Sequence, residues 1–389
     1  MGIAFLKIRT GAVVCAVLAA AVFACAARAA EPALQCQWTN PNTGRQAAFA
    51  FYENPLIIAT AGQNITLSAA AHGVQGQVTV FKGAQPIRTG ASVALTAPDA
   101  PGAYYIPLAV EAAGMRRETE ICVFVPHKAV GRVVANGWDL TVDGESVGNY
   151  RNPAKSGNAK VRGNPDSYMP PPWWLRVTPM NAQFAVVPGL TAGELVVASE
   201  DTGEQHTDLV PVCYPMWTAI LTVRQEMERR GIPAGVMKLI SMFRAPAYNR
   251  GVGSNAYGRH VYGDSFDFYI DLENDGKASD LNRDGKRDRR DAYPIVAMIE
   301  DLQDDGKIPM GGIGVYNSVA GDHEVTMHLD MRGHRATWGF LTSASGKKSE
   351  FSWASRRFAE LDRHEENLAA ERAAKEGRKY ARPNREPLP

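Results

Sequence analysis

Two short segments of alternating side chains constrain the fold of this chain most strongly. In residues 265–272 apolar side chains alternate with polar ones, namely Phe266, Phe268, Ile270 and Leu272 with Ser265, Asp267 and Asp271. In residues 324–332 the same alternation sets Val325, Met327, Leu329 and Met331 against Glu324, Thr326, His328, Asp330 and Arg332. A period of two is typical of a β-strand with one core face and one polar face. We therefore expect two strands whose polar faces carry Asp267 and His328.

A third chemically notable residue, His260, lies in the glycine-flanked loop just before the first of these strands. Two imidazoles and a carboxylate, two of them close in sequence and the third distant, form a credible set of three protein ligands. Such a set suits a catalytic zinc ion that keeps an open fourth position. The alternative is that His260, Asp267 and His328 are an ordinary strand carboxylate and two histidines with satisfied hydrogen bonds.

The elements around these strands predict an α+β domain with a small antiparallel sheet over residues 213–345. Residues 214–230 repeat apolar side chains at helical spacing, and Gly231 follows where a C-terminal cap belongs. A strand over 236–241 precedes Arg244, a helix is expected over 292–302, and 311–316 is expected as a glycine-rich turn into a strand. The glycines do not lead from a strand into a helix, so we do not expect a phosphate loop.

The chain begins with a short basic region, an apolar run and the small residues Ala27 and Ala29 around Arg28. This pattern predicts a secretory signal peptide over residues 1–30 and no stable membrane span after its cleavage. The alternatives are an uncleaved anchor or a lipoprotein signal that ends before Cys25. In an oxidising compartment one disulfide is compatible with the remaining cysteines, and we favour Cys36 with Cys122.

The N-terminal part of the mature chain, residues 31–126, predicts an all-β domain. Short apolar runs recur at intervals of about ten residues between Gly, Asn, Pro and Asp turns, which is typical of an immunoglobulin-like β-sandwich. Residues 127–212 are rich in Gly and Pro and predict a linker with covering loops. Residues 346–389 predict a charged tail. A net charge of +1 implies no basic surface, so we expect no nucleic-acid partner.

A candidate calcium loop follows the first alternating strand. Residues 280–291 have the spacing of an EF-hand loop, with Gly285 at position six and oxygen ligands at positions one, three, five, nine and twelve: Asp280, Asn282, Asp284, Asp288 and Asp291. The departures are an aspartate at position twelve and Arg287 at the usually apolar eighth position. The alternative is a solvated turn.

Five stretches together resemble the zinc D-alanyl-D-alanine carboxypeptidases and dipeptidases of bacterial cell walls. They are SMFRAPAYN, GRHVYGDSFDF, GGIGVY, MHLDMRG and RATW, all within residues 236–338. The resemblance is strongest to the periplasmic Gram-negative branch of that family. It implies a periplasmic peptidase with zinc at His260, Asp267 and His328, with Arg244 gripping a substrate carboxylate or oxyanion, and with peptidoglycan peptides as substrate.

One departure from the family concerns the general base. The resemblance places a catalytic acid three residues before the last histidine ligand, but that position is Val325. We expect Glu324 to serve as base, with Asp322 and His323 as rivals, and Asp330 to orient a ligand histidine. The missing acid leaves open a second hypothesis, a wall-binding protein that keeps the metal fold without catalysis. A third, a calcium-stabilised adhesion module built on the β-sandwich, leaves the zinc ligands unexplained.

Overall fold

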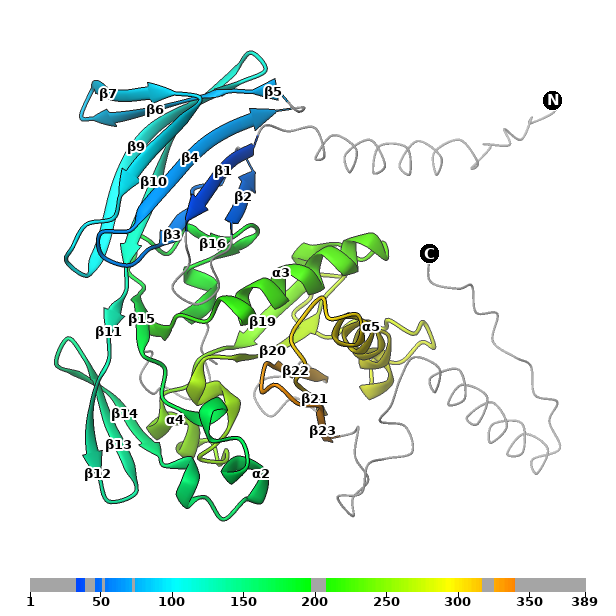
Figure 1. Cartoon of the computed structure of the whole chain (residues 1–389). Coiled ribbons are helices and arrows are strands. Elements are labelled where there is room, and N and C mark those ends of the chain that lie inside the picture. Colours follow the sequence, from blue (N-terminus) through cyan, green and yellow to red (C-terminus); the bar gives the residue numbers. More distant parts are fainter. Residues whose placement is uncertain are drawn as a thin grey trace, which may run out of the picture. The chain divides into compact units, whose positions relative to one another are not determined.

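The computed structural model describes residues 33–38, 46–50, 53–71, 74–196, 208–316 and 325–339. The chain divides into two compact units (Figure 1): Met1–Asp99 with Tyr104–Val123, and Ala100–Ala103 with Phe124–Pro389. The described part is mostly β-sheet, and its four α-helices all belong to the second unit. None of the described helices has the length and apolarity needed to cross a membrane. The expected signal peptide and charged tail lie outside the described residues.

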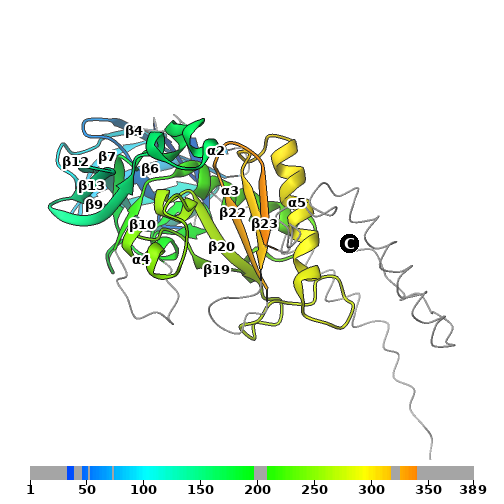
Figure 2. The same cartoon turned by 90° about the horizontal axis from the view of Figure 1, so that it is seen from below.

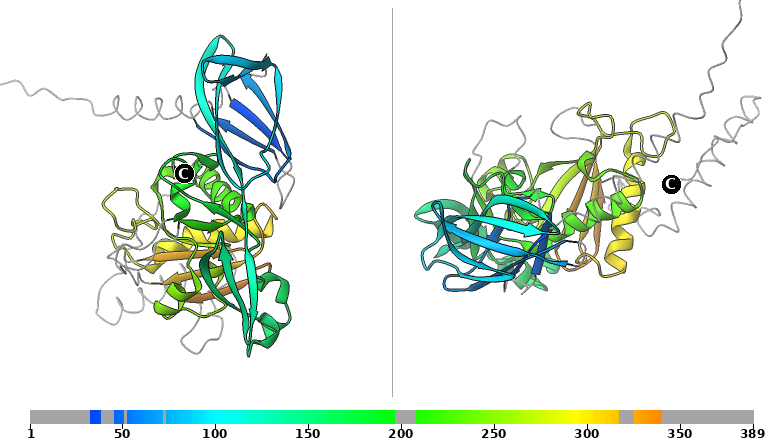
Figure 3. Two further views of the ribbon diagram at one scale, coloured as in Figure 1. Left: turned by 90° about the vertical axis from the view of Figure 1, so that its left-hand side faces the viewer. Right: turned by 90° about the horizontal axis from the view of Figure 1, so that it is seen from above.

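The first unit is built from two five-stranded sheets (Figure 3). The first sheet contains β2 (Gln46–Ala50), β1 (Ala33–Trp38), β4 (Asn64–Ala71), β5 (Val74–Gln75) and β8 (Ser92–Thr96). The second sheet contains β3 (Leu56–Ile58), β10 (Met115–Val125), β9 (Gly102–Ala112), β6 (Gln77–Lys82) and β7 (Gln85–Gly90). Alternate residues are buried, as at Ile65 and Leu67 of β4 and Val78 and Val80 of β6. The unit is all-β as expected, and its immunoglobulin-like topology stays a prediction.

The disulfide favoured between Cys36 and Cys122 is not formed, because Cys122 is a free, buried thiol. The two cysteines lie on β1 and β10, which belong to different sheets. Sequence spacing says nothing about the Cα separation that a disulfide requires. Burial raises the pKa of the Cys122 thiol to about 12, so this sulfur is held as an unreactive neutral group.

Residues 127–212 are not the expected linker, because they contain three small sheets that belong to the second unit. The sheets are β11 (His127–Lys128) with β15 (Trp173–Arg176) and β18 (Leu209–Pro211), β12 (Val130–Val134) with β13 (Gly137–Val142) and β14 (Glu145–Arg151), and β16 (Ala185–Val187) with β17 (Leu190–Thr191). One short helix, α2 (Ala159–Arg162), follows β14. Trp174 is fully buried, and its Nε1 donates a hydrogen bond to the carbonyl of Pro171 at 3.0 Å. Some of the glycines and prolines lie within the strands themselves, as Gly131 does on β12 and Pro211 does on β18.

The second unit also contains a five-stranded sheet with the order β19-β20-β22-β21-β23. Its strands are β19 (Met237–Ser241), β20 (Ser265–Ile270), β22 (Thr326–Asp330), β21 (Gly312–Tyr316) and β23 (Ala336–Gly339). Neighbouring strands are antiparallel except β21 and β23, which run parallel. The sheet is therefore mixed, although an antiparallel one was expected, because a second segment returns alongside β21.

Three further helices complete this unit: α3 (Tyr214–Arg229), α4 (Pro246–Gly251) and α5 (Tyr293–Asp304). The two longer ones, α3 and α5, lie beside the five-stranded sheet (Figure 2). Their expected apolar stripes are buried, including Ile220 and Val223 on α3 and Met298 and Ile299 on α5. On the sheet, Phe266, Phe268, Met327 and Leu329 are buried and leave the alternate side chains for the opposite face. That opposite face carries the candidate site.

Candidate metal centre

One row of residues crosses all five strands of this sheet. The strand registers place Ser241 opposite Asp267, Asp267 opposite His328, His328 opposite Gly314, and Gly314 beside Trp338. Directly paired residues of neighbouring strands point to the same face of a sheet. The register shifts between Leu239 and Ser241, and this irregularity brings Ser241 into the row. The row thus joins residues from five separate segments of the chain.

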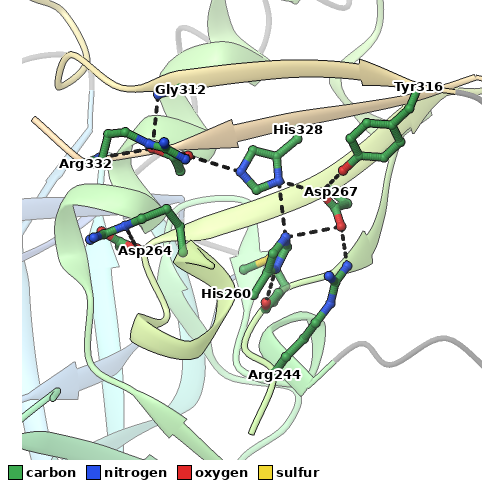
Figure 4. Close-up of polar contacts among 11 residues, drawn as sticks. Arg244, His260, Asp264, Asp267, Gly312, Tyr316, His328 and Arg332 are labelled. Carbon is green, nitrogen blue, oxygen red and sulfur yellow. Dashed lines mark hydrogen bonds and ion pairs between the residues drawn. The ribbon is translucent and has the colours of Figure 1, made fainter. Parts of the chain in front are cut away.

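The predicted ligands His260, Asp267 and His328 come together on this face (Figure 4). One ligand atom from each lies within 4.8 Å of the others, and the three residues are only 5%, 3% and 5% exposed. His260 Nε2 is 3.2 Å from His328 Nδ1 and 3.2 Å from Asp267 Oδ2. His328 Nδ1 is 2.7 Å from Asp267 Oδ1. Asp267 and His328 stand on paired strands, whereas His260 reaches the row from a short 3-10 helix, Arg259–Tyr262.

A hydrogen bond on the side of the ring away from the cluster orients His260. Its Nδ1 lies 2.6 Å from the carbonyl oxygen of Met242, which can only accept a hydrogen bond. Nδ1 therefore carries the proton, and in the neutral ring the lone pair is on Nε2. That lone pair faces Asp267 and His328.

His328 is oriented in the same way by Asp330. Its Nε2 lies 3.2 Å from Asp330 Oδ2. Asp330 has no exposed surface, and it also accepts hydrogen bonds from the backbone of Gly312 and from the guanidinium of Arg332. Burial alone would raise the pKa of Asp330, but His328 and Arg332 hold it well below its usual range, so the group is an anion. The outer nitrogen of His328 donates to this anion, and Nδ1 is left for the cluster.

The third ligand, Asp267, is held on both carboxylate oxygens. Arg244 donates to Oδ2, and the hydroxyl of Tyr316 donates to Oδ1 at 2.8 Å (Figure 4). Burial opposes ionisation of Asp267, but the two histidines outweigh burial and keep its pKa well below the ordinary value. Burial and hydrogen bonding also shift the two imidazoles. Burial lowers the pKa of His260. For His328, hydrogen bonds to Asp267 and Asp330 outweigh burial and raise the pKa.

Three lone-pair donors thus converge on one point while their outer atoms are committed to other groups. In the absence of a cation these donors share protons. A metal ion that replaced the shared proton would be held by two nitrogens and one oxygen. The residues present therefore fit a metal ion, and this buried His-Asp-His cluster could bind one.

The expected general base lies outside the described residues, as do its rivals: Glu324, Asp322 and His323. Val325, at the position where the resemblance implies an acid, is only 2% exposed. Sequence reasoning missed two neighbours of the cluster, Tyr316 and Trp338. Both were visible as aromatic residues within the GGIGVY and RATW stretches, but their contacts depend on the order of the strands.

The predicted calcium ligands are arranged differently from the buried cluster. Within the described residues, the group of three or more His, Cys, Asp or Glu side chains that could hold a metal is His260, Asp267 and His328, and the 280–291 loop supplies none. Asp280 accepts hydrogen bonds from the backbone of Asp284 and Gly285, at 3.1 and 2.7 Å. Arg290 pairs with Asp284 at 3.0 Å and with Asp288 at 2.8 Å. A calcium ion would compete with this arginine, and the calcium site stays a prediction.

Comparison with known proteins gives no independent assignment. No family model matches the chain, and no curated protein matches it significantly. Function therefore has to be inferred from the site.

Proposed function

We propose that this chain is a zinc-dependent peptidase that cleaves peptide bonds next to D-amino acids in peptidoglycan stem peptides or cross-links. The observation that carries the proposal is the convergence of His260 Nε2, His328 Nδ1 and the Asp267 carboxylate, with the outer atoms of both rings already committed. Two imidazoles and one carboxylate are a common ligand set of hydrolytic zinc sites. The resemblance of residues 236–338 to D-alanyl-D-alanine peptidases supports the substrate class, and the expected signal peptide supports a periplasmic location.

When bound, zinc would supply Lewis-acid polarisation of the scissile carbonyl and an activated water. The chain itself contributes Arg244 to hold the substrate. Its Nε donates to Ser241 Oγ at 2.8 Å and its Nη2 donates to Asp267, so the guanidinium is fixed at two points. Among the described residues Nη1 has no hydrogen-bond partner, and the side chain is 19% exposed. A planar guanidinium fixed in this way suits a substrate carboxylate or a developing oxyanion.

Proton transfer needs a base that the described carboxylates of the site do not offer. Asp267 is committed to the metal cluster, and Asp330 is committed to Arg332, Gly312 and His328. We assign this role to Glu324, with Asp322 and His323 as the alternatives in the same segment. Glu324→Gln should abolish hydrolysis without weakening metal binding.

The second candidate function is non-catalytic binding of cell-wall peptides. Its specific support is Val325, a buried apolar residue where the resemblance implies an acid. Such a protein would bind the metal and would hold the peptide through Arg244, but it would not hydrolyse it.

Digestion of purified peptidoglycan by the mature protein, read by mass spectrometry, tests both candidates. Release of D-alanine that a zinc chelator stops indicates a carboxypeptidase, and chelator-sensitive loss of cross-linked dimers indicates an endopeptidase. Arg244→Lys should lower activity at least tenfold, because one ammonium cannot reproduce the two fixed contacts. Arg250→Lys, on the exposed side of α4, is the matched control and should be as active as the wild type. Intact peptidoglycan after incubation with zinc-loaded, folded protein would refute hydrolysis and favour binding.

A further inference from the structure

A glycine interrupts the row of side chains that crosses the sheet. Gly314 stands between His328 on β22 and Trp338 on β23, and it is in register with both. Two strands separated by a third are about 10 Å apart, which normally keeps their side chains from touching. Because Gly314 has no side chain, the indole of Trp338 reaches across β21 and meets the His328 ring with a centroid distance of 4.9 Å at 60°. This is an edge-to-face aromatic contact.

The space for the indole is matched closely by two glycines. A Cβ atom on Gly314 would lie 2.5 Å from Trp338 Nε1, and one on Gly312 would lie 2.5 Å from Trp338 Cζ3. Neither glycine has the positive φ that would require glycine for conformational reasons. Room for the indole therefore explains Gly312 and Gly314, whereas a Cβ on Gly311 would meet the backbone carbonyl oxygen of Asp330 at 1.5 Å.

The indole also closes a ring of four residues that includes His328. His328 contacts Asp330, Asp330 contacts Arg332, and the Arg332 guanidinium lies 4.9 Å from the centre of the Trp338 ring. Trp338 then returns to His328. Asp330 fixes the imidazole along its Nε2 direction, whereas an edge-to-face neighbour restricts the tilt of its plane. Together the two contacts would hold Nδ1 toward His260 and Asp267.

We propose that Trp338 is a positioning residue for metal binding, and that Gly314 is there to give its indole access to His328. The inference rests on the metal-binding part of the proposed function. Trp338 acts through His328, so its removal should weaken the affinity for zinc even without substrate. A partner that orients a metal ligand typically changes metal affinity by about 10–100-fold.

Zinc affinity of the purified mature protein, measured by competition with a chromophoric chelator, tests the proposal. Trp338→Ala should weaken affinity about tenfold, and Trp338→Phe should recover most of the loss because an aromatic ring still faces His328. Gly314→Ala should weaken affinity at least as much as Trp338→Ala, since a methyl group would displace the indole. The absorption spectrum of the cobalt-substituted protein should change in the first and third variants, because the position of one ligand changes.

Two matched controls separate positioning from general loss of stability. Trp138→Ala removes a half-buried tryptophan on β13, and Gly131→Ala adds a methyl on β12 that would meet Leu140 Cδ1 at an ordinary 3.4 Å. Both should keep wild-type zinc affinity, although the first should lower the melting temperature. If circular dichroism shows that Trp338→Ala does not fold, the zinc affinities of Gly314→Ala and Trp338→Phe still test the proposal.

Wild-type zinc affinity in folded Trp338→Ala or Gly314→Ala would overturn the role of Trp338 and leave the metal site itself intact. An equal loss in Trp138→Ala would also overturn it. A wild-type protein that binds no zinc would instead overturn the proposed function on which this inference rests.

Discussion

Replacing Asp330 by asparagine tests how the site selects the ligand nitrogen of His328. The substitution keeps the shape of the side chain but exchanges one acceptor oxygen for a donor. Asp330 Oδ1 accepts from Gly312 N at 3.0 Å and from Arg332 N at 3.1 Å, so the amide oxygen should stay on that side. The amide NH₂ then faces His328 Nε2, which now lies 3.2 Å from Oδ2. An NH₂ group donates, so Nε2 would become the acceptor and the proton would move to Nδ1.

The expected magnitude follows from this change of tautomer. With the proton on Nδ1, His328 no longer presents a lone pair to the cluster. We expect zinc affinity to fall about 10–100-fold, which corresponds to about 1.4–2.7 kcal/mol. Stability should fall as well, by about 2–3 kcal/mol, because the Arg332 side chain is only 20% exposed and loses its charged partner. Chelator competition measures the first effect, and urea unfolding of the zinc-free protein measures the second.

Asp264→Asn is the matched control for this experiment. Asp264 is also a buried aspartate paired with an arginine, Arg259, but it makes no contact with the three ligands among the hydrogen bonds of the described residues. It should lose stability while keeping zinc affinity. If Asp330→Asn bound zinc as tightly as the wild type, His328 would not need Asp330 to set its tautomer, and the assignment of Nδ1 as the ligand atom would be wrong.

Two further predictions concern helix α3 and the 280–291 loop. Glu226→Gln should lower the free energy of unfolding at pH 7 by about 1–2 kcal/mol. Hydrogen bonds to Arg229 and Arg230 lower the pKa of Glu226 from 4.5 to about 2, so this stability is present above pH 4.5 and the difference should shrink as pH falls towards 2 in urea titrations. If the 280–291 loop binds calcium, saturating calcium should raise the melting temperature of wild type by about 5 °C and leave Asp280→Asn unchanged. An equal rise in both proteins, by differential scanning fluorimetry, would exclude that loop.

The sequence was informative where a short segment determines its own structure. Alternation over 265–272 and 324–332 predicted two strands with Asp267 and His328 on polar faces, and the structure has strands at Ser265–Ile270 and Thr326–Asp330. The same logic failed at Leu272, which is 42% exposed because β20 ends at Ile270. It also failed over 127–212, where strands as short as two residues lack a readable period and where glycine and proline occur within strands as well as in turns.

Long-range relations were not accessible from local pattern. The disulfide prediction treated sequence position as a guide to separation, and the structure keeps Cys122 as a buried free thiol. The contact between Trp338 and His328 depends on β21 lying between β22 and β23, and nothing in RATW or MHLDMRG specifies that order. Similarly, the grip of Arg244 on Asp267 depends on the irregularity that brings Ser241 into register with Asp267.

The site combines a rigid half with a half supplied by a loop, and the metal would join them. Asp267 and His328 are neighbours on paired strands, so the sheet fixes their separation. His260 belongs to the segment after β19, where its carbonyl accepts from Arg244 N at 3.2 Å and its Nδ1 bonds the Met242 carbonyl. This backbone hydrogen bond joins the segments that carry His260 and Arg244. A cation between His260 and the two strand ligands would hold this segment against the sheet and would reinforce the contacts to Ser241 and Asp267 that already fix Arg244. Loss of metal should then weaken substrate binding through Arg244 as well as remove the Lewis acid.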